Sequence, residues 1–177
     1  MIEYFAFLRG INVGGKNSIK MEDLRQIFED CGFSNVRSYI QSGNIIFSYK
    51  KAEIHSLGKK IEEKIFKSAG LNIPVFLRIR EQLEEMVKLN PFNEALPIEN
   101  SKQYVAFLSA QVLISHPMPL LSEKNGLELV SIINENVFLL SFPIGDHSGF
   151  PNNFIEKKYK VTATSRYWHV VIKMLEM

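Results

Sequence analysis

A short turn between two strand-like runs constrains the fold of this chain more than any other sequence feature. Residues 36–41 and 44–49 both have the pattern of a strand, and Ser42-Gly43 separates them. The glycine tolerates the positive φ that a tight turn requires, so the two runs predict an antiparallel hairpin. A sheet built only from parallel strands does not fit this segment, because parallel neighbours need a long crossover connection.

Periodicity on both sides of the hairpin predicts the remaining elements of a first lobe. Residues 3–9 have the pattern of a central strand, and residues 75–80 alternate as another strand. Apolar residues three and four apart mark one helix from Met21 and a second from Ile54 to Gly70. The order strand, helix, hairpin, helix, strand is that of the ferredoxin-like split βαβ arrangement. We therefore predict an α/β protein of the α+β type, with the first strand inside the sheet.

The second half of the chain repeats this order loosely. A short helix over residues 81–89 leads into a segment with two prolines, which cannot lie inside regular structure. Residues 104–109 then predict a strand, residues 127–133 and 137–142 a hairpin, and Ser165 can cap a final helix with Trp168 on its buried face. We predict a ferredoxin-like lobe over residues 1–89, a linker over 90–102 and a loosely similar α/β lobe over 103–177. One compact unit is the alternative.

Composition excludes several classes of protein. The 177 residues carry a net charge of +2, which is too small for a chain dedicated to coating nucleic acid. The single Cys31 excludes a disulfide framework, and the four histidines lack the spacing of a metal site, so we expect no metal and no cofactor. No apolar run approaches the ~20 residues that span a bilayer, and the first residues lack a basic leader. We expect a cytoplasmic protein without a membrane partner.

A glycine-rich loop follows the first strand. Residues 10–17 satisfy the phosphate-loop pattern G-x-x-x-x-G-K, but Asn17 stands where Ser or Thr would reach Mg²⁺. The hairpin that follows also disagrees with the parallel sheet of such enzymes. Two interpretations remain. The loop either binds an anion through its glycine N–H groups with Arg9 and Lys16, or its glycines only permit a tight turn.

The hairpin tip is predicted to lie beside this loop. Because the first and third strands of a split βαβ run in opposite directions, Asn44 is expected near Arg9 and Gly10. The candidate ligand-binding residues are therefore in two segments: Arg9, Gly14, Gly15, Lys16, Gln41, Ser42 and Asn44. The hypothesis is a site for a small anionic molecule, either bound or acted upon, and the sequence names no catalytic residue and does not decide whether the protein is an enzyme.

Two other functions stay open. Alternation places arginines among aromatic side chains on one sheet face, a composition that single-stranded RNA readers use, and the tail adds Arg166 and Trp168 as secondary candidates. A nucleic-acid-binding module is therefore the first alternative. The second is a scaffold or interaction protein without a ligand, in which a second lobe covers the aromatic face. The oligomeric state is not readable from the sequence.

Three segments together resemble a known bacterial family. They are residues 8–17, residues 39–44 and residues 164–168, and the family is domain of unknown function 1697. The resemblance spans nearly the whole chain and implies a compact cytoplasmic α/β protein of about this length, without an established activity. In the third segment the family pattern has Asn where this chain has Tyr167 and His169, so a ligand role of that pair does not carry over.

Overall fold

The computed structural model describes residues 1–93, 95 and 98–177. These residues form two compact units, Met1–Glu84 and Glu85–Met177. The division lies inside helix α3 (Arg80–Leu89). Of the predicted linker over residues 90–102, residues 94, 96 and 97 lie outside the described part of the chain.

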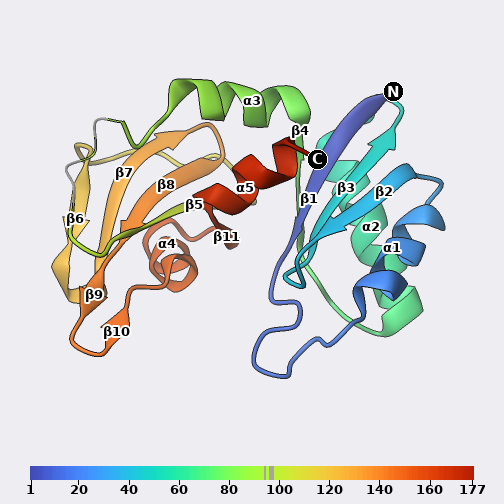
Figure 1. Ribbon diagram of the computed structural model, residues 1–177, viewed down its shortest axis with the longest axis horizontal. Helices are drawn as coiled ribbons and strands as arrows, with labels where there is room; N and C mark the ends of the chain where they lie inside the picture. Colours follow the sequence, from blue (N-terminus) through green and yellow to red (C-terminus); the bar gives the residue numbers. More distant parts are fainter. Residues whose placement is uncertain (94, 96–97) are drawn as a thin grey trace. The chain divides into compact units, whose positions relative to one another are not determined.

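Unit one contains a four-stranded sheet with helices on one face (Figure 1). Its elements in chain order are β1 (Ile2–Leu8), α1 (Met21–Glu29), β2 (Ser34–Tyr39), β3 (Asn44–Tyr49), α2 (Ile54–Ala69) and β4 (Val75–Ile79). The strand order is β2-β3-β1-β4, and every neighbouring pair is antiparallel. This confirms the hairpin and the inner position of the first strand. The order is compatible with the ferredoxin-like arrangement, and the α+β class is confirmed.

The core of unit one lies between this sheet and its two helices. Side chains alternate across a strand, so Tyr4, Ala6 and Leu8 of β1 share the face that packs against α1 and α2. Phe47 is central to the core, because its ring contacts those of Tyr4 at 5.3 Å and Phe33 at 4.3 Å between centroids. Such ring pairs each add about 0.5–1.5 kcal/mol beyond the area they bury.

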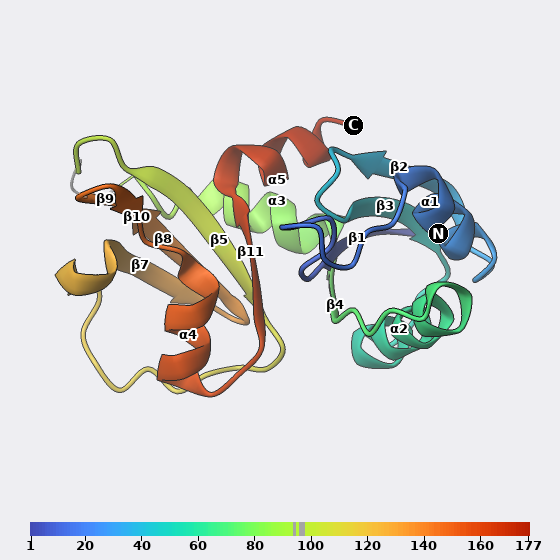
Figure 2. The same ribbon diagram turned by 90° about the horizontal axis from the view of Figure 1, so that it is seen from below.

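Unit two contains a five-stranded sheet in the order β11-β5-β8-β7-β6, with α4 on one face (Figure 2). Its elements are β5 (Lys102–Leu108), β6 (Leu120–Ser122), the 3₁₀ helix η1 (Glu123–Asn125), β7 (Leu127–Ile133), β8 (Asn136–Ser141), β9 (Pro143–Ile144), β10 (His147–Ser148), α4 (Pro151–Tyr159), β11 (Ala163–Tyr167) and α5 (Trp168–Leu175). Strands β9 and β10 pair only with each other. The predicted strand after residue 104 and the predicted hairpin are confirmed.

The two sheets share a strand order and two unusual buried positions. The order β11-β5-β8-β7 matches β4-β1-β3-β2, and residues 109–126 of unit two take the place of α1 in the chain order. Each sheet buries an asparagine at the start of one strand, Asn44 in β3 and Asn136 in β8. Each sheet also buries an arginine in its last strand, Arg78 in β4 and Arg166 in β11. Each arginine donates to the carbonyl of the preceding residue, at 2.7 and 2.8 Å. Unit two therefore repeats the strand order of unit one, with residues 109–126 in the place of α1.

The prediction for the C-terminal segment was wrong at one point. Ser165 does not cap a helix, because residues 163–167 form strand β11 and pair with β5, Ala163 opposite Leu108. The Ser165 hydroxyl instead donates to Asn152 Oδ1 at 2.5 Å. Pairing with a neighbouring strand satisfies a whole row of backbone groups, and this outweighs the single bond that a cap provides.

Helix α5 starts only after this strand, at Trp168. Trp168 is buried, as predicted, and its ring lies 5.5 Å from that of Phe138 and 6.0 Å from that of Phe92. The later start of the helix changes which of its positions are buried. They are Val170, Val171 and Met174, whereas Ile172 and Leu175 are only partly buried.

Candidate functional site

The glycine-rich loop folds into a miniature hairpin. Gly14 and Gly15 have φ of +59° and +74°, and the N–H of Lys16 donates to the carbonyl of Val13 at 3.1 Å. Two successive residues with positive φ inside such a bond are the signature of a two-residue hairpin turn, which is why glycine occupies both positions. Asn17 donates to the carbonyl of Gly10 at 3.1 Å and ties the two arms of the loop together. This geometry differs from a phosphate loop, which leads directly into a helix.

Asn12 connects the loop to the hairpin tip. Its Nδ2 donates to the carbonyls of Gln41 and Ile19, both at 3.0 Å, while its Oδ1 accepts from the N–H of Ile19 at 2.9 Å. Asn12 also has a φ of +55°, a conformation that asparagine tolerates better than most residues. Asn12 is not among the residues predicted for the site, although an asparagine inside a glycine-rich loop is a signal of such a turn.

The hairpin tip packs directly against the end of β1. The N–H of Leu8 donates to the carbonyl of Gly43 at 2.8 Å, which extends the ladder between β1 and β3. Gly43 has a φ of +73°, and a Cβ at this position would lie 2.9 Å from Cβ of Leu8. Only glycine fits this approach without a shift of the chain. The loop and the tip therefore lie together at one end of β1.

Asn44 closes the tip from inside. It is fully buried opposite Phe7, and its amide donates to Ser42 Oγ at 2.9 Å and to the carbonyl of Tyr39 at 3.2 Å. Buried polar groups need such partners, so Asn44 fixes the shape of the tip. Gln41 is exposed and Ser42 is half-buried, so both side chains reach the surface of the tip.

The loop and the tip carry only positive formal charge. Residues 9–20 include Arg9, Lys16 and Lys20, and neither this segment nor residues 38–44 contain Asp or Glu. Lys16 and Lys20 are exposed, whereas Arg9 is half-buried. A further cation comes from α1, where Arg25 donates to Ser38 Oγ at 2.8 Å. Charges of one sign on adjacent segments raise the local potential and attract anions.

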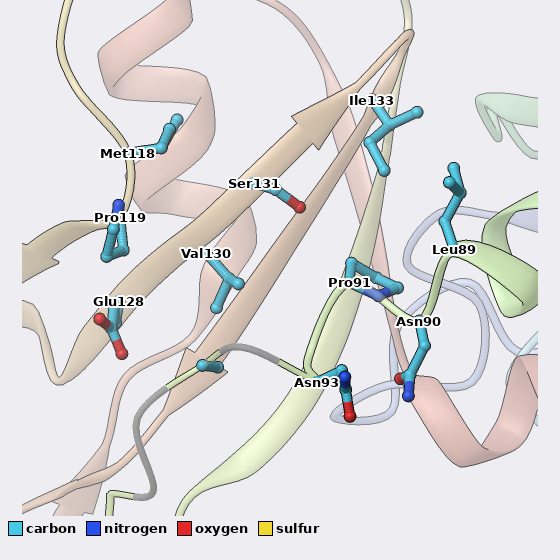
Figure 3. A pocket seen from close by; sticks show the side chains of 11 residues that line it. Leu89, Asn90, Pro91, Asn93, Met118, Pro119, Glu128, Val130, Ser131 and Ile133 are labelled. Carbon is cyan, nitrogen blue, oxygen red and sulfur yellow. The ribbon is translucent and has the colours of Figure 1, made fainter.

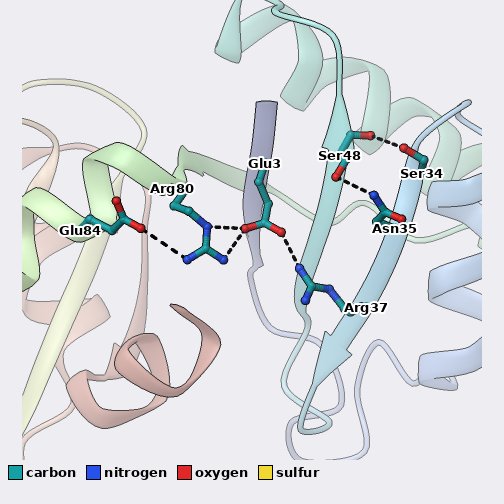
Figure 4. Close-up of polar contacts among 7 residues, drawn as sticks. All are labelled: Glu3, Ser34, Asn35, Arg37, Ser48, Arg80 and Glu84. Atoms are coloured by element: carbon teal, nitrogen blue, oxygen red, sulfur yellow. Dashed lines mark hydrogen bonds and ion pairs between the residues drawn. The ribbon is translucent and has the colours of Figure 1, made fainter. Parts of the chain in front are cut away.

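Strand register brings the predicted aromatic and basic face of unit one together. Phe5 pairs with Arg78 on one side and, through Ile46, lies in the same row as Arg37. Glu3 accepts from both Arg37 and Arg80 (Figure 4). The Arg80 guanidinium also lies over the Phe5 ring, 5.4 Å from its centroid. Phe5 is 0% exposed and Phe76 is 5% exposed. The rings therefore do not form the open stacking surface that an RNA-binding sheet requires.

The two secondary candidates in the tail are both buried. Arg166 donates to Thr164 Oγ1 at 3.0 Å and to the carbonyl of Ser165, and burial lowers the pKa of its guanidinium to about 10. Trp168 is 4% exposed within the aromatic group described above. Their side chains have structural roles in unit two and offer little surface to a ligand.

The two residues that flank Trp168, Tyr167 and His169, carry exposed rings. The ring of Tyr167 stacks on that of His169 with centroids 5.4 Å apart, and its centroid lies 4.5 Å from that of the Tyr104 ring. Burial raises the pKa of the Tyr104 hydroxyl. Lys102 and His169 are exposed beside Tyr167, and all three line a shallow depression. The sequence predicted Tyr167 on a helix. Tyr167 instead ends strand β11, and this position brings its ring beside those of Tyr104 and His169.

The described residues offer no cluster of three His, Cys, Asp or Glu side chains that could hold a metal ion. Cys31 is buried, and burial raises the pKa of its thiol, which makes it a poor nucleophile at neutral pH. Across the same ranges, no helix combines the length and the apolar character needed to cross a membrane.

Comparison with known proteins identifies the family. The chain is similar to a solved structure described as conserved bacterial protein SP0830 from Streptococcus pneumoniae, with 23% identity, a TM-score of 0.60, and coverage of 99% of this chain and 97% of that one. This likeness supports the fold. No curated protein matches the chain. The model of the family described as protein of unknown function (DUF1697) matches residues 1–138, more than half of the chain, and the chain belongs to this family.

Proposed function

We propose that the protein binds a small anionic molecule where the glycine-rich loop meets the hairpin tip. The proposal rests on two neighbouring segments, residues 9–20 and 38–44, which the hydrogen bonds of Asn12 hold together. These segments contain cationic side chains and no carboxylate. A site fixed in this way loses little conformational freedom when a ligand binds, and this favours affinity. The setting we propose is the cytoplasm.

The residues divide into two roles under this proposal. Lys16 and Arg9 supply charge-assisted hydrogen bonds, which are the stronger contacts to an anion. Gln41 and Ser42 supply neutral groups that orient the ligand, and the exposed Gly14 and Gly15 contribute backbone N–H groups at the turn. Asn12 and Asn44 hold the two segments in place. No reaction is part of the proposal.

Titration of the full chain with inorganic phosphate tests the proposal, read by backbone amide chemical shifts. We expect shifts at residues 9–20 and 40–43, and binding that weakens as salt is added. Lys16→Gln should reduce affinity by up to about fivefold, since the lysine is exposed, and Arg9→Gln should reduce it more. Lys51→Gln is the matched control, because Lys51 is an exposed lysine outside both segments. Equal affinities in Lys16→Gln, Arg9→Gln and this control would contradict the proposal.

The neighbouring rings of Tyr167 and His169 favour a second candidate function. Tyr167 and His169 are exposed residues beside Lys102, and exposed aromatic rings can stack on unpaired bases, contributing about 1–3 kcal/mol for each base. Oligouridylate should quench the intrinsic fluorescence and bind more weakly to Tyr167→Ala, with Tyr49→Ala as the control. Binding that is unchanged in Tyr167→Ala would remove this candidate.

A further inference from the structure

Unit two contains a cavity of about 460 Å³ that has no part in the site proposed above (Figure 3). One wall is strand β7, and the opposite side is formed by the end of α3 and the segment that follows it, including Leu89 and Pro91. Met118 and Pro119 close one end. Its size lies in the usual range of small-molecule pockets, roughly 300–1,000 Å³.

A β-bulge determines which side chains line the cavity. Leu129 pairs with Leu139, and Ser131 pairs with Phe138, so Val130 is an extra residue in β7. An extra residue reverses the alternation of side chains beyond it. Glu128 pairs with Leu140, two positions along β8 from Phe138, and therefore Glu128 and Ser131 share one face although they are three residues apart. That face lies opposite the core that packs against α4.

The polar atoms of this wall are buried and unsatisfied. Glu128 is 8% exposed, and its Oε2 has no hydrogen-bond partner in the described part of the chain. The Ser131 hydroxyl is likewise buried without a partner among those residues. A native structure leaves few such groups, because each costs free energy when water is removed from it. Burial raises the pKa of the Glu128 carboxyl.

The remaining lining is mainly aliphatic. Leu89, Pro91, Val130 and Ile133 contribute carbon surface, and Asn90 and Asn93 add amide groups. A ligand that fits must therefore contact carbon on most sides and donate hydrogen bonds at one end. A negatively charged end would meet a carboxyl group, and an alcohol would leave the buried carboxylate without a counter-charge.

We propose that this cavity binds a small protonated organic amine with an aliphatic body. The ammonium donates to Glu128 Oε2, the Ser131 hydroxyl is a second acceptor on the same wall, and the carbon chain lies against Leu89, Pro91 and Ile133. A primary ammonium has three hydrogens, so it satisfies the orphaned carboxylate oxygen and retains donors for other acceptors of the lining. No covalent step is involved. The proposal is independent of the anion site, which lies in the other unit.

The test uses n-hexylammonium, with 1-hexanol and hexanoate as neutral and anionic matches of the same length. Each is titrated at neutral pH into the full chain, and binding is followed by amide chemical shifts. We expect saturable shifts for n-hexylammonium at residues 89–93 and 128–133, and affinity about ten- to hundredfold higher than for 1-hexanol, as for a buried charged hydrogen bond. Equal affinity for 1-hexanol would show an apolar pocket without amine recognition and overturn the proposal, as would the absence of saturable binding.

Variants connect the preference to the named atoms. Glu128→Gln keeps the size of the side chain and removes its charge, so it should abolish the preference for the ammonium. Ser131→Ala should weaken binding less. Glu123→Gln is the control, since Glu123 is an exposed carboxylate of the same unit. A preference that persists in Glu128→Gln, or that falls equally in Glu123→Gln, would refute the assignment.

Discussion

Replacing Gly43 by alanine tests how tightly the hairpin tip packs on β1. Two costs act at this position. The φ of +73° forces alanine into the left-handed region, which costs about 1–2 kcal/mol. The new Cβ would also lie 2.9 Å from Cβ of Leu8 and 3.4 Å from Cβ of Ile11, two core side chains that cannot swing away. Overpacking of a core costs about 1–3 kcal/mol, so Gly43→Ala should lose about 2–5 kcal/mol in all.

Gly15→Ala separates these two costs. Gly15 has a φ of +74°, almost the same as Gly43, but no atom lies within 4 Å of the position that its Cβ would occupy. It therefore pays the conformational cost alone, about 1–2 kcal/mol. The difference between the two variants measures the packing of the tip and is expected to be about 1–3 kcal/mol.

Equilibrium urea unfolding followed by far-ultraviolet circular dichroism gives both free energies. The comparison between variants removes the contribution of unit two, which is the same in each. The slope of free energy against urea should stay constant, because neither change alters the surface exposed on unfolding. Equal destabilisation by Gly43→Ala and Gly15→Ala would refute the argument and mean that the tip does not press against Leu8.

Three further changes test other parts of the structure. Trp168→Ala should reduce the free energy of unfolding by on the order of 3–5 kcal/mol, because it removes a buried ring from contact with Phe92 and Phe138; urea unfolding checks this, and a loss below about 0.5 kcal/mol would show that the ring is not packed. Glu53 caps α2 by accepting two backbone N–H groups. A hydrogen bond with the Ser56 side chain, together with the backbone bonds from Ser56 and His55, lowers the pKa of the Glu53 carboxyl to about 2. The contribution of this charged cap to the free energy of unfolding should therefore be complete above about pH 4.5 and disappear as the pH falls towards about 2. The unfolding midpoints of the wild type and Glu53→Gln, measured at a series of acid pH values, should converge. A difference that stays constant with pH would contradict the cap. Burial raises the pKa of the Glu128 carboxyl, so Glu128→Gln should raise the thermal midpoint at neutral pH and lose this advantage as the wild-type carboxyl becomes protonated in acid; no gain at neutral pH would contradict the burial argument.

The sequence predicts correctly those elements whose apolar periodicity or capping residues reflect their local structure. The helix from Ile54 ends at Gly70, which has a φ of +70° and closes it as expected. Strand β11 was missed because Thr164, Ser165 and Arg166 give no apolar alternation. Its conformation comes from pairing with β5, a contact between residues about 60 positions apart, and local patterns do not record such pairing.

The candidate site was predictable in position and less so in its details. Antiparallel pairing of the first and third strands places the tip at the end of β1, and that rule requires only the element order. The burial of Asn44 and the connecting role of Asn12 depend on which way each side chain points from a turn. The charged wall of the cavity was not predictable, because its residues do not alternate regularly and a bulge in β7 is not visible in the sequence.

The bulge in β7 makes the polar wall of the cavity tolerant of one change in chain length. Deleting Val130 would leave Glu128 and Ser131 two positions apart in a regular strand, and alternation would again place both side chains on one face. The polar wall would persist, and only the Val130 side chain would be lost from the lining. A one-residue gap at this position in related chains is therefore compatible with the same cavity wall.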